Sequence, residues 1–91
     1  IDFDARQVSV HGRPVELTRV EFELLERLAS RPGAAVTRRQ LVECALDPER
    51  EGGERTLDVH ISRIRTKLGE AADHLETVWG IGYRLAEEPE P

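Results

Sequence analysis

Residues 55–68 read RTLDVHISRIRTKL, and the hydrophobic positions of this stretch decide the fold. They recur at intervals of four, three and four residues, the spacing of one buried stripe on an α-helix. These positions are Leu57, Ile61, Ile64 and Leu68. At about 100° per residue the cations fall on the flanks of this stripe, away from the core. The stretch therefore predicts a core helix with a basic outer surface.

Charge is unevenly distributed along the 91 residues. The formal net charge is −5, yet residues 54–68 hold four basic and two acidic side chains. A length of 91 residues suits one domain with one modest core. No apolar run is long enough to span a bilayer and no signal pattern is visible, so we expect a cytoplasmic protein. The chain begins at Ile1 rather than Met, and we expect it to be part of a longer protein.

The flanking segments predict the order sheet, helix, helix, helix and hairpin. Residues 1–17 alternate apolar and polar side chains around His11-Gly12, which indicates two or three antiparallel strands. TRVE at 18–21 and TRRQ at 37–40 match capping boxes that open two helices, and Pro32-Gly33 ends the first. Gly69 ends the third helix, and LETVWGIGYRL at 75–85 predicts two strands joined at 80–82. Residues 86–91 are expected to be an acidic flexible tail.

Three of these blocks together resemble the effector domain of OmpR/PhoB-type response regulators. The blocks are TRVEFELLERLASRPGAAVTRRQL, RTLDVHISRIRTKL and TVWGIGYRL. The resemblance covers residues 1–85 and implies an α+β fold, a winged helix-turn-helix with an N-terminal antiparallel sheet, three helices and a C-terminal β-hairpin wing. It further implies sequence-specific binding of double-stranded DNA as the output domain of a two-component regulator of transcription.

The resemblance also implies which side chains meet DNA. The expected major-groove residues are Arg55, Thr56, Val59, His60 and Arg63, and Arg65 and Lys67 would reach flanking phosphates. Arg63 is the first choice for base readout, because a guanidinium fork suits the O6/N7 edge of guanine. His60 is either a phosphate contact or a polar surface residue. Asp58 would be repelled by phosphates, so a nearby arginine is its expected partner.

The wing departs from the family pattern at one position. Trp79 stands where many members carry an arginine that enters the minor groove, so it either packs on a DNA sugar or on protein, or it covers the sheet. Thr77 could touch a phosphate, Gly82 is expected to permit the turn, and Tyr83 is expected in the core. Ser62 occupies a position that is often basic.

Further partners follow from the resemblance. A receiver domain and a histidine kinase are implied in the intact protein, although no receiver is present in this chain. The isolated domain is expected to be a monomer that binds DNA in tandem. Asp47, Glu49, Arg50 and Glu51 lie in the charged loop 47–53, which either contacts RNA polymerase or is a plain surface loop.

Two other classes of function are alternatives to DNA binding. A protein-interaction module would suit the net acidity. An enzyme is disfavoured, because the sequence offers no paired carboxylates, no phosphate-binding glycine loop and no nucleophile with a base. His11, His60 and His74 lie in different predicted elements, so neither a metal site nor a cofactor is expected. Cys44 is expected to be a half-buried side chain rather than a nucleophile.

Overall fold

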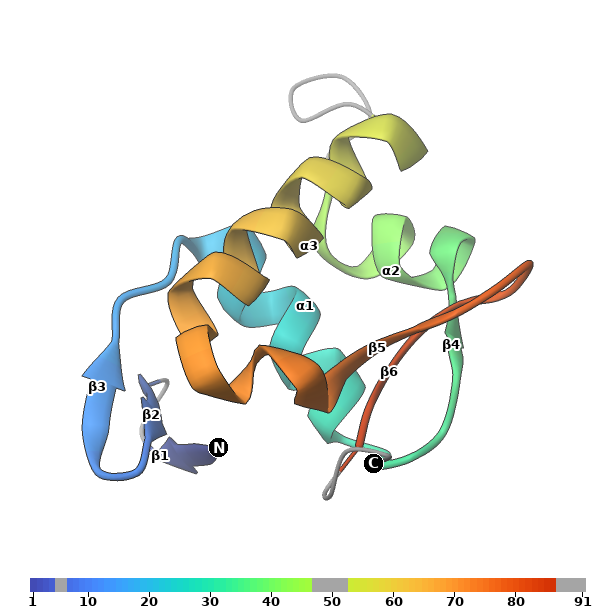
Figure 1. Ribbon diagram of the computed structural model, residues 1–91. Helices are drawn as coiled ribbons and strands as arrows, with labels where there is room; N and C mark the ends of the chain where they lie inside the picture. The colour runs from blue at the N-terminus through green and yellow to red at the C-terminus, as the bar shows by residue number, and fades with distance from the viewer. Residues whose placement is uncertain (5–6, 47–52, 87–91) are drawn as a thin grey trace.

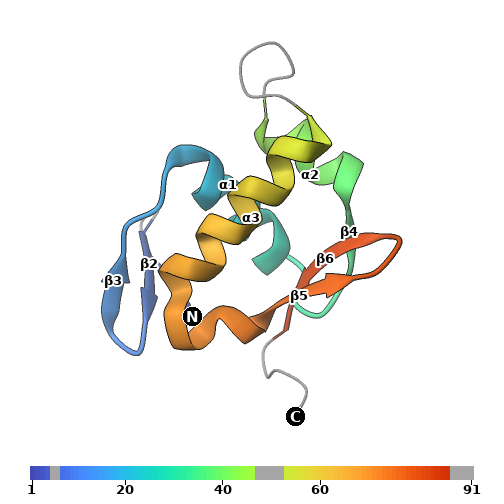
Figure 2. The same ribbon diagram turned by 45° about the horizontal axis from the view of Figure 1, so that its top comes forward.

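The computed structural model describes residues 1–4, 7–46 and 53–86, and it shows two small sheets on either side of three helices (Figure 1). The third helix crosses in front of the first in both views (Figures 1 and 2). The helices are α1 (Arg19–Ala29), α2 (Arg38–Ala45), α3 (Glu54–Leu68) and the 3₁₀ helix η1 (Gly69–His74). The predicted α+β architecture is confirmed.

The N-terminal sheet consists of three antiparallel strands in the order β1-β2-β3. They are β1 (Asp2–Asp4), β2 (Gln7–Val10) and β3 (Arg13–Val15). The predicted turn at His11-Gly12 joins β2 to β3, and both residues have positive φ, 50° and 79°. Phe3 packs edge to face on Phe22 of α1 at 6.3 Å between ring centroids, which ties the sheet to the helices.

Both predicted capping boxes are present. At α1 the Thr18 hydroxyl accepts from the Glu21 amide at 3.2 Å, and the Glu21 carboxylate accepts from the Thr18 amide at 2.9 Å. At α2 the corresponding bonds join Thr37 and Gln40 at 3.0 and 3.1 Å. Each box satisfies amides that a helix N-terminus would otherwise leave unpaired, so both helices begin where the sequence predicts.

The apolar stripe of α3 forms the centre of the core. Its four predicted positions are at most 3% exposed, and they pack in one cluster with Leu24, Leu25 and Leu28 of α1. α3 ends at Leu68, and Gly69 follows with φ of 60°, as predicted for a C-terminal stop. Because one face of α3 is committed to the core, its other faces point outward.

The C-terminal sheet has a strand that the sequence did not predict. β5 (Leu75–Val78) and β6 (Gly82–Leu85) form the expected hairpin, and β4 (Val36–Thr37) pairs with β6 just before α2 begins. Gly80, with φ of 78°, provides the turn. The prediction that Gly82 permits the turn is wrong. Gly82 instead starts β6 opposite Thr37, where a Cβ would overlap the Val36 carbonyl oxygen.

The C-terminal end of β6 is held by η1. The Ala86 amide donates to the His74 carbonyl oxygen at 2.8 Å, and the Ala86 oxygen lies 2.8 Å from His74 Nδ1. Ala86 was assigned to the tail, yet these bonds fix it to the domain, while residues 87–91 lie outside the described part of the chain. Among the described residues, no helix has the length and apolar character needed to cross a membrane.

Candidate nucleic-acid interface

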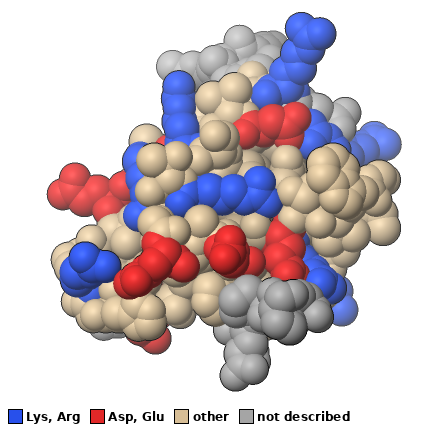
Figure 3. Space-filling view, in the orientation of Figure 1, with Lys and Arg blue, Asp and Glu red and all other residues tan. Residues whose placement is uncertain are grey.

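The outward surface of α3 is the most basic part of the described face. Figure 3 shows lysine and arginine side chains over α3 and beyond its N-terminal end, with acidic side chains in a row over η1 and the start of β5. The acidic residues of those two elements are Glu70, Asp73 and Glu76. On this face the basic side chains over α3 lie beside an acidic row over η1, and a local positive surface coexists with net acidity.

The structure places the five predicted major-groove residues on one exposed side of α3. Arg55, Val59 and Arg63 are exposed and follow one another at intervals of four residues, which aligns them along the helix. Val59 is 46% exposed, which is unusual for a large apolar side chain. Thr56 and His60 are half-buried beside this row. His60 Nδ1 is buried and finds no hydrogen-bond partner within the described residues.

Asp58 has the structural partner that was predicted for it. Arg38 of α2 donates to its two carboxylate oxygens at 2.5 and 2.9 Å, and the Tyr83 hydroxyl of β6 donates at 2.6 Å. These bonds, first from Arg38 and then from Tyr83, hold the pKa of the Asp58 carboxyl below its ordinary value. Tyr83 is buried, as expected, and burial and the carboxylate raise the pKa of its hydroxyl. The acidic side chain on α3 is thus neutralised by a neighbouring helix.

Arg65 faces the wing rather than solvent. Its guanidinium donates to the Leu75 carbonyl oxygen at 2.7 and 3.1 Å and to the Thr77 hydroxyl at 3.0 Å. It also lies over the Tyr83 ring, 5.6 Å from the centroid. Both Arg65 and Thr77 were predicted to contact phosphates. In the structure they are hydrogen-bonded to each other, and this bond attaches β5 to α3.

Lys67 also has an internal partner. Its ammonium contacts the Glu21 carboxylate at 2.5 Å, and the Glu21 side chain is only 1% exposed. Burial raises the pKa of the Glu21 carboxyl, but the bonds from Lys67 and Thr18 outweigh it, so the pKa lies below its ordinary value. The predicted phosphate contact of Lys67 must therefore compete with a buried ion pair that joins α3 to the start of α1.

The wing exposes two large apolar side chains on either side of Gly80. Trp79 is 88% exposed and Ile81 is 49% exposed. The alternative in which Trp79 covers the sheet is therefore wrong. A hollow separates α3 from the wing, and Arg38, Asp58, Ser62, Trp79 and Ile81 are among the residues that line it. The hairpin projects away from the helices on the side of α2 (Figure 1).

The loop candidates Asp47, Glu49, Arg50 and Glu51 lie outside the described residues. Cys44 on α2 is exposed rather than half-buried, and partial desolvation by the neighbouring chain is the largest cause that raises the pKa of its thiol. No cluster of metal-binding side chains occurs in the described ranges.

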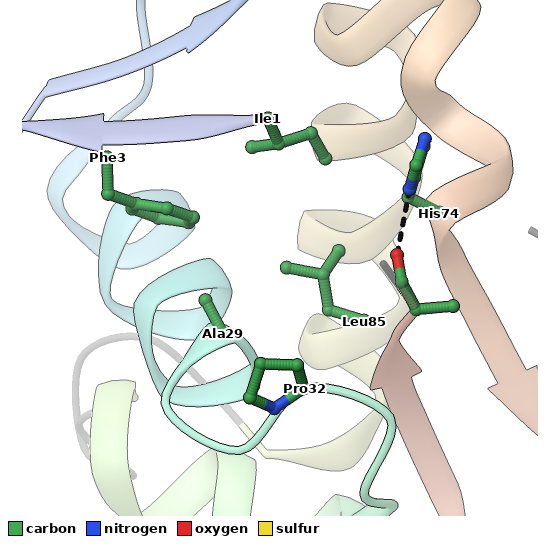
Figure 4. A pocket seen from close by; sticks show the side chains of 7 residues that line it. Ile1, Phe3, Ala29, Pro32, His74 and Leu85 are labelled. Carbon is green, nitrogen blue, oxygen red and sulfur yellow. Dashed lines mark hydrogen bonds between the residues drawn. The ribbon is translucent and has the colours of Figure 1, made fainter. Parts of the chain in front are cut away.

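A second hollow lies far from the basic surface, beneath the N-terminal sheet. Figure 4 shows Ile1, Phe3 and Leu85 pointing into it, with His74 at its edge bonded to Ala86. Its lining side chains are almost all apolar. His74 is the only titratable side chain among them, and its ring already contacts a carbonyl oxygen, so these described residues supply no catalytic pair.

Residues 12–85 match the family model described as "Transcriptional regulatory protein, C terminal". The chain belongs to this family, the C-terminal DNA-binding domains of OmpR/PhoB-type response regulators. Members of the family are output domains that bind DNA and control transcription, and they are not enzymes.

Two curated relatives illustrate the similarity of this response-regulator domain. Transcriptional regulatory protein CseB of Streptomyces coelicolor is 44% identical over 85 residues, which are 93% of this chain and 36% of the relative. Transcriptional regulatory protein ResD of Bacillus subtilis is 42% identical over 89 residues, with coverages of 93% and 37%. The chain thus spans little more than a third of the length of these two proteins.

Solved structures agree with the fold of the response-regulator domain. The DNA-binding domain of response regulator AdeR, in complex with an intercistronic region, has a TM-score of 0.79 at 32% identity, covering 97% of this chain and 92% of that one. The DNA-binding domain of Klebsiella pneumoniae RstA, in complex with the RstA box, has a TM-score of 0.75 at 33% identity, with coverages of 90% and 84%.

Two residues of the site were missed by sequence reasoning. Arg38 was assigned no role, although its bonds to Asp58 place it in the hollow beside the wing. The sequence indicated this role in part, because the acidic Asp58 on a basic helix is expected to have a cationic partner. It did not indicate which cation that partner is. Ile81 was counted only as part of the turn, and its exposure depends on the hairpin geometry.

Proposed function

We propose that this domain binds a specific DNA sequence by placing α3 in the major groove and the β5–β6 wing at the adjacent minor groove. The observation that carries the proposal is the exposed row of Arg55, Val59 and Arg63 on a helix whose opposite face is fully buried. A rigid helix of this kind fits the major groove, where side chains reach base edges. The AdeR and RstA domains, which have this fold, form complexes with DNA, and this supports DNA binding by the present domain.

The proposed roles differ along the interface. Arg63 reads a guanine, and Val59 supplies an apolar contact such as one with a thymine methyl group. Arg55, Thr56 and His60 contact the backbone or base edges beside them. Trp79 packs on sugars of the minor groove in place of an arginine. Arg65, Lys67 and Thr77 are not included, because internal acceptors or donors engage them.

The role of the intact protein is proposed from its relatives. We infer an upstream receiver domain that is phosphorylated by a histidine kinase and brings two output domains together. The isolated domain would then be a monomer that binds repeated half-sites in tandem, because its apolar stripes are already committed to one core. The charged loop 47–53 is proposed as a contact for RNA polymerase.

Selection of bound duplexes from a random-sequence pool tests the central proposal. We expect enrichment of one short motif, present as a direct repeat in the tightest binders. Affinity for that motif should fall steeply with salt, as it does when phosphates are neutralised. A pool that shows no enriched motif after repeated rounds would favour a protein-binding module instead.

Replacing Arg63 tests base readout within the motif. Arg63→Ala should weaken binding to the selected duplex by about 1–3 kcal/mol, the usual worth of a bidentate base contact. The side chain is exposed, so the thermal unfolding of the variant should match that of the wild type. Fluorescence anisotropy on the selected duplex and on a random duplex measures the difference. Equal losses on both would reduce Arg63 to a phosphate contact.

A further inference from the structure

The wing is attached to the helices at its root by backbone bonds. β4 pairs with β6, and the Arg38 amide donates to the Ile81 carbonyl oxygen at 3.2 Å. Thr37, the last residue of β4, is also the N-cap of α2. The backbone therefore fixes the wing to the start of α2, but among residues 1–4, 7–46 and 53–86 it makes no bond of this kind between the wing and α3.

Side chains provide the connection between the wing and α3. The Asp58 carboxylate of α3 accepts hydrogen bonds from Arg38 of α2 and from Tyr83 of β6. The Arg65 guanidinium of α3 donates hydrogen bonds to Leu75 and Thr77 of β5. Each strand of the wing is thus attached to α3 by its own polar side chain. The two attachments also meet, because the Arg65 guanidinium lies over the Tyr83 ring.

Asp58 occupies an unexpected position for a structural carboxylate. Its side chain is 52% exposed, and it lines the hollow between α3 and the wing together with Arg38 and Trp79. A carboxylate at the edge of a DNA-binding surface repels phosphates, so it weakens binding to every sequence alike. Because Asp58 weakens DNA binding in this way, we expect it to have a compensating role, which is to orient the wing relative to α3.

We propose that Asp58 is a positioning residue that determines specificity: it holds the wing at a fixed place against α3 and keeps the Arg38 guanidinium directed at the protein rather than at phosphates. This inference rests on the proposed function, since it assigns a role within the same interface. Asp58 touches no base in this scheme. It acts by fixing the distance between the DNA contacts of α3 and those of the wing. Only DNA that fits both sets of contacts at this distance is then bound tightly.

The inference predicts different changes on two kinds of DNA. Asp58→Asn keeps the size of the side chain but removes its charge and one of the two oxygen acceptors of Arg38. Affinity for random duplex should then rise, because one negative charge is lost and Arg38 is held less tightly by the protein. The salt slope on that duplex should steepen by up to about one unit. On the duplex selected by the wild type, loss of wing placement should cancel this gain. We expect the ratio of the two affinities to fall about tenfold, the worth of one base contact.

Glu43→Gln is the matched control. Glu43 is an exposed carboxylate that accepts from Arg39 at 3.0 Å, both on α2, so the variant makes the same change of charge at a comparable exposed ion pair. Its affinities for the two duplexes should move together, and their ratio should stay within about twofold of the wild type. Any effect of net charge alone is thereby separated from the effect of position.

The chain's single tryptophan, Trp79, reports the placement of the wing directly. In the wild type we expect its fluorescence to change on binding the selected duplex. The change should be reduced in Asp58→Asn at saturating DNA, but not in Glu43→Gln. Tyr83→Phe gives a second test, because it removes one donor to Asp58 and leaves the Arg38 pair. It should lower the affinity ratio without raising affinity for random duplex.

The outcomes separate this inference from the proposed function. If the wild type prefers no duplex, the proposed function fails. If it prefers the selected duplex but Asp58→Asn changes the ratio no more than Glu43→Gln does, Asp58 is not a positioning residue. An unchanged Trp79 signal in both Asp58→Asn and Tyr83→Phe would overturn the inference in the same way. Circular dichroism of each variant confirms folding, and Tyr83→Phe keeps the test open if Asp58→Asn does not fold.

Discussion

Gly82→Ala is expected to destabilise the domain by about 3 kcal/mol, at the upper end of what overpacking a close contact costs. The added Cβ would overlap the Val36 carbonyl oxygen and lie 3.0 Å from both Arg38 N and Thr37 C. All three atoms belong to the backbone, so no side-chain rotation relieves the overlap. The only relief is separation of β4 from β6, which would also release the start of α2 from the wing.

Gly80→Ala is the control for this substitution. Gly80 has φ of 78°, but nothing lies within 4 Å of the position its Cβ would take. It should lose about 1 kcal/mol, the cost of a left-handed conformation for a residue with a side chain. Urea titrations that follow far-UV circular dichroism give both unfolding free energies. Similar losses at the two glycines would show that the approach of β4 to β6 is not tight.

Features with a local signal were predicted well. The two capping boxes and the stripe of α3 each depend on residues within one or two turns of helix, and the sequence spacing states them directly. The same holds for the turn at His11-Gly12. The family resemblance added the wing and the docking face, which local patterns alone do not distinguish from any solvated basic helix.

Features that depend on distant partners were mostly not predicted, the arginine partner of Asp58 being an exception. β4 has only two residues, and its pairing is visible only once β6 is placed beside it. The internal partners of Arg65 and Lys67 were not predicted for the same reason, because spacing shows that a cation is outside the core but not what lies opposite it. Their acceptors are 10 and 46 residues away in sequence. A position beside a basic row is thus weak evidence for a contact with DNA.

The positions of these partners divide the outer residues of α3 into two groups, one available to a ligand and one bonded to the rest of the domain. Within the described part of the chain, the side chains of the exposed row, Arg55, Val59 and Arg63, form no hydrogen bond or ion pair, so they are available to a ligand. Those on the flanks, Asp58, Arg65 and Lys67, bond to α2, the wing and α1 respectively. Substitutions in the first group should alter binding with little loss of stability, whereas those in the second should alter stability or wing placement.

Lys67→Met is expected to destabilise the domain by about 2–3 kcal/mol at neutral pH. The methionine keeps most of the aliphatic length, but it leaves the Glu21 carboxylate, 1% exposed, without its cation. Removing one partner of a fully buried pair costs roughly 3–5 kcal/mol. The value here should be lower, because the Lys67 side chain is 36% exposed and water can reach part of the vacated space.

The pH dependence of this loss distinguishes charge from packing. In the wild type the pKa of Glu21 lies below its ordinary value, so its contribution is present above the unfolded pKa and is lost as pH falls through the folded pKa. In Lys67→Met burial acts without the hydrogen bond and the charge of Lys67, so the folded pKa of Glu21 should rise. Protonation then relieves the variant, and the difference in unfolding free energy should narrow from pH 7 towards about pH 4.

Two further variants complete the test of the Glu21–Lys67 pair. Glu21→Gln combined with Lys67→Met should be more stable than Lys67→Met alone at pH 7, because glutamine removes the buried charge and still completes a capping box with Thr18. Arg39→Met breaks an exposed pair with Glu43 and should change the unfolding free energy by about 0.5 kcal/mol or less. A loss in Lys67→Met that is constant from pH 7 to about pH 4 would show that packing of the lysine chain, and not its charge, stabilises this junction of α1 and α3.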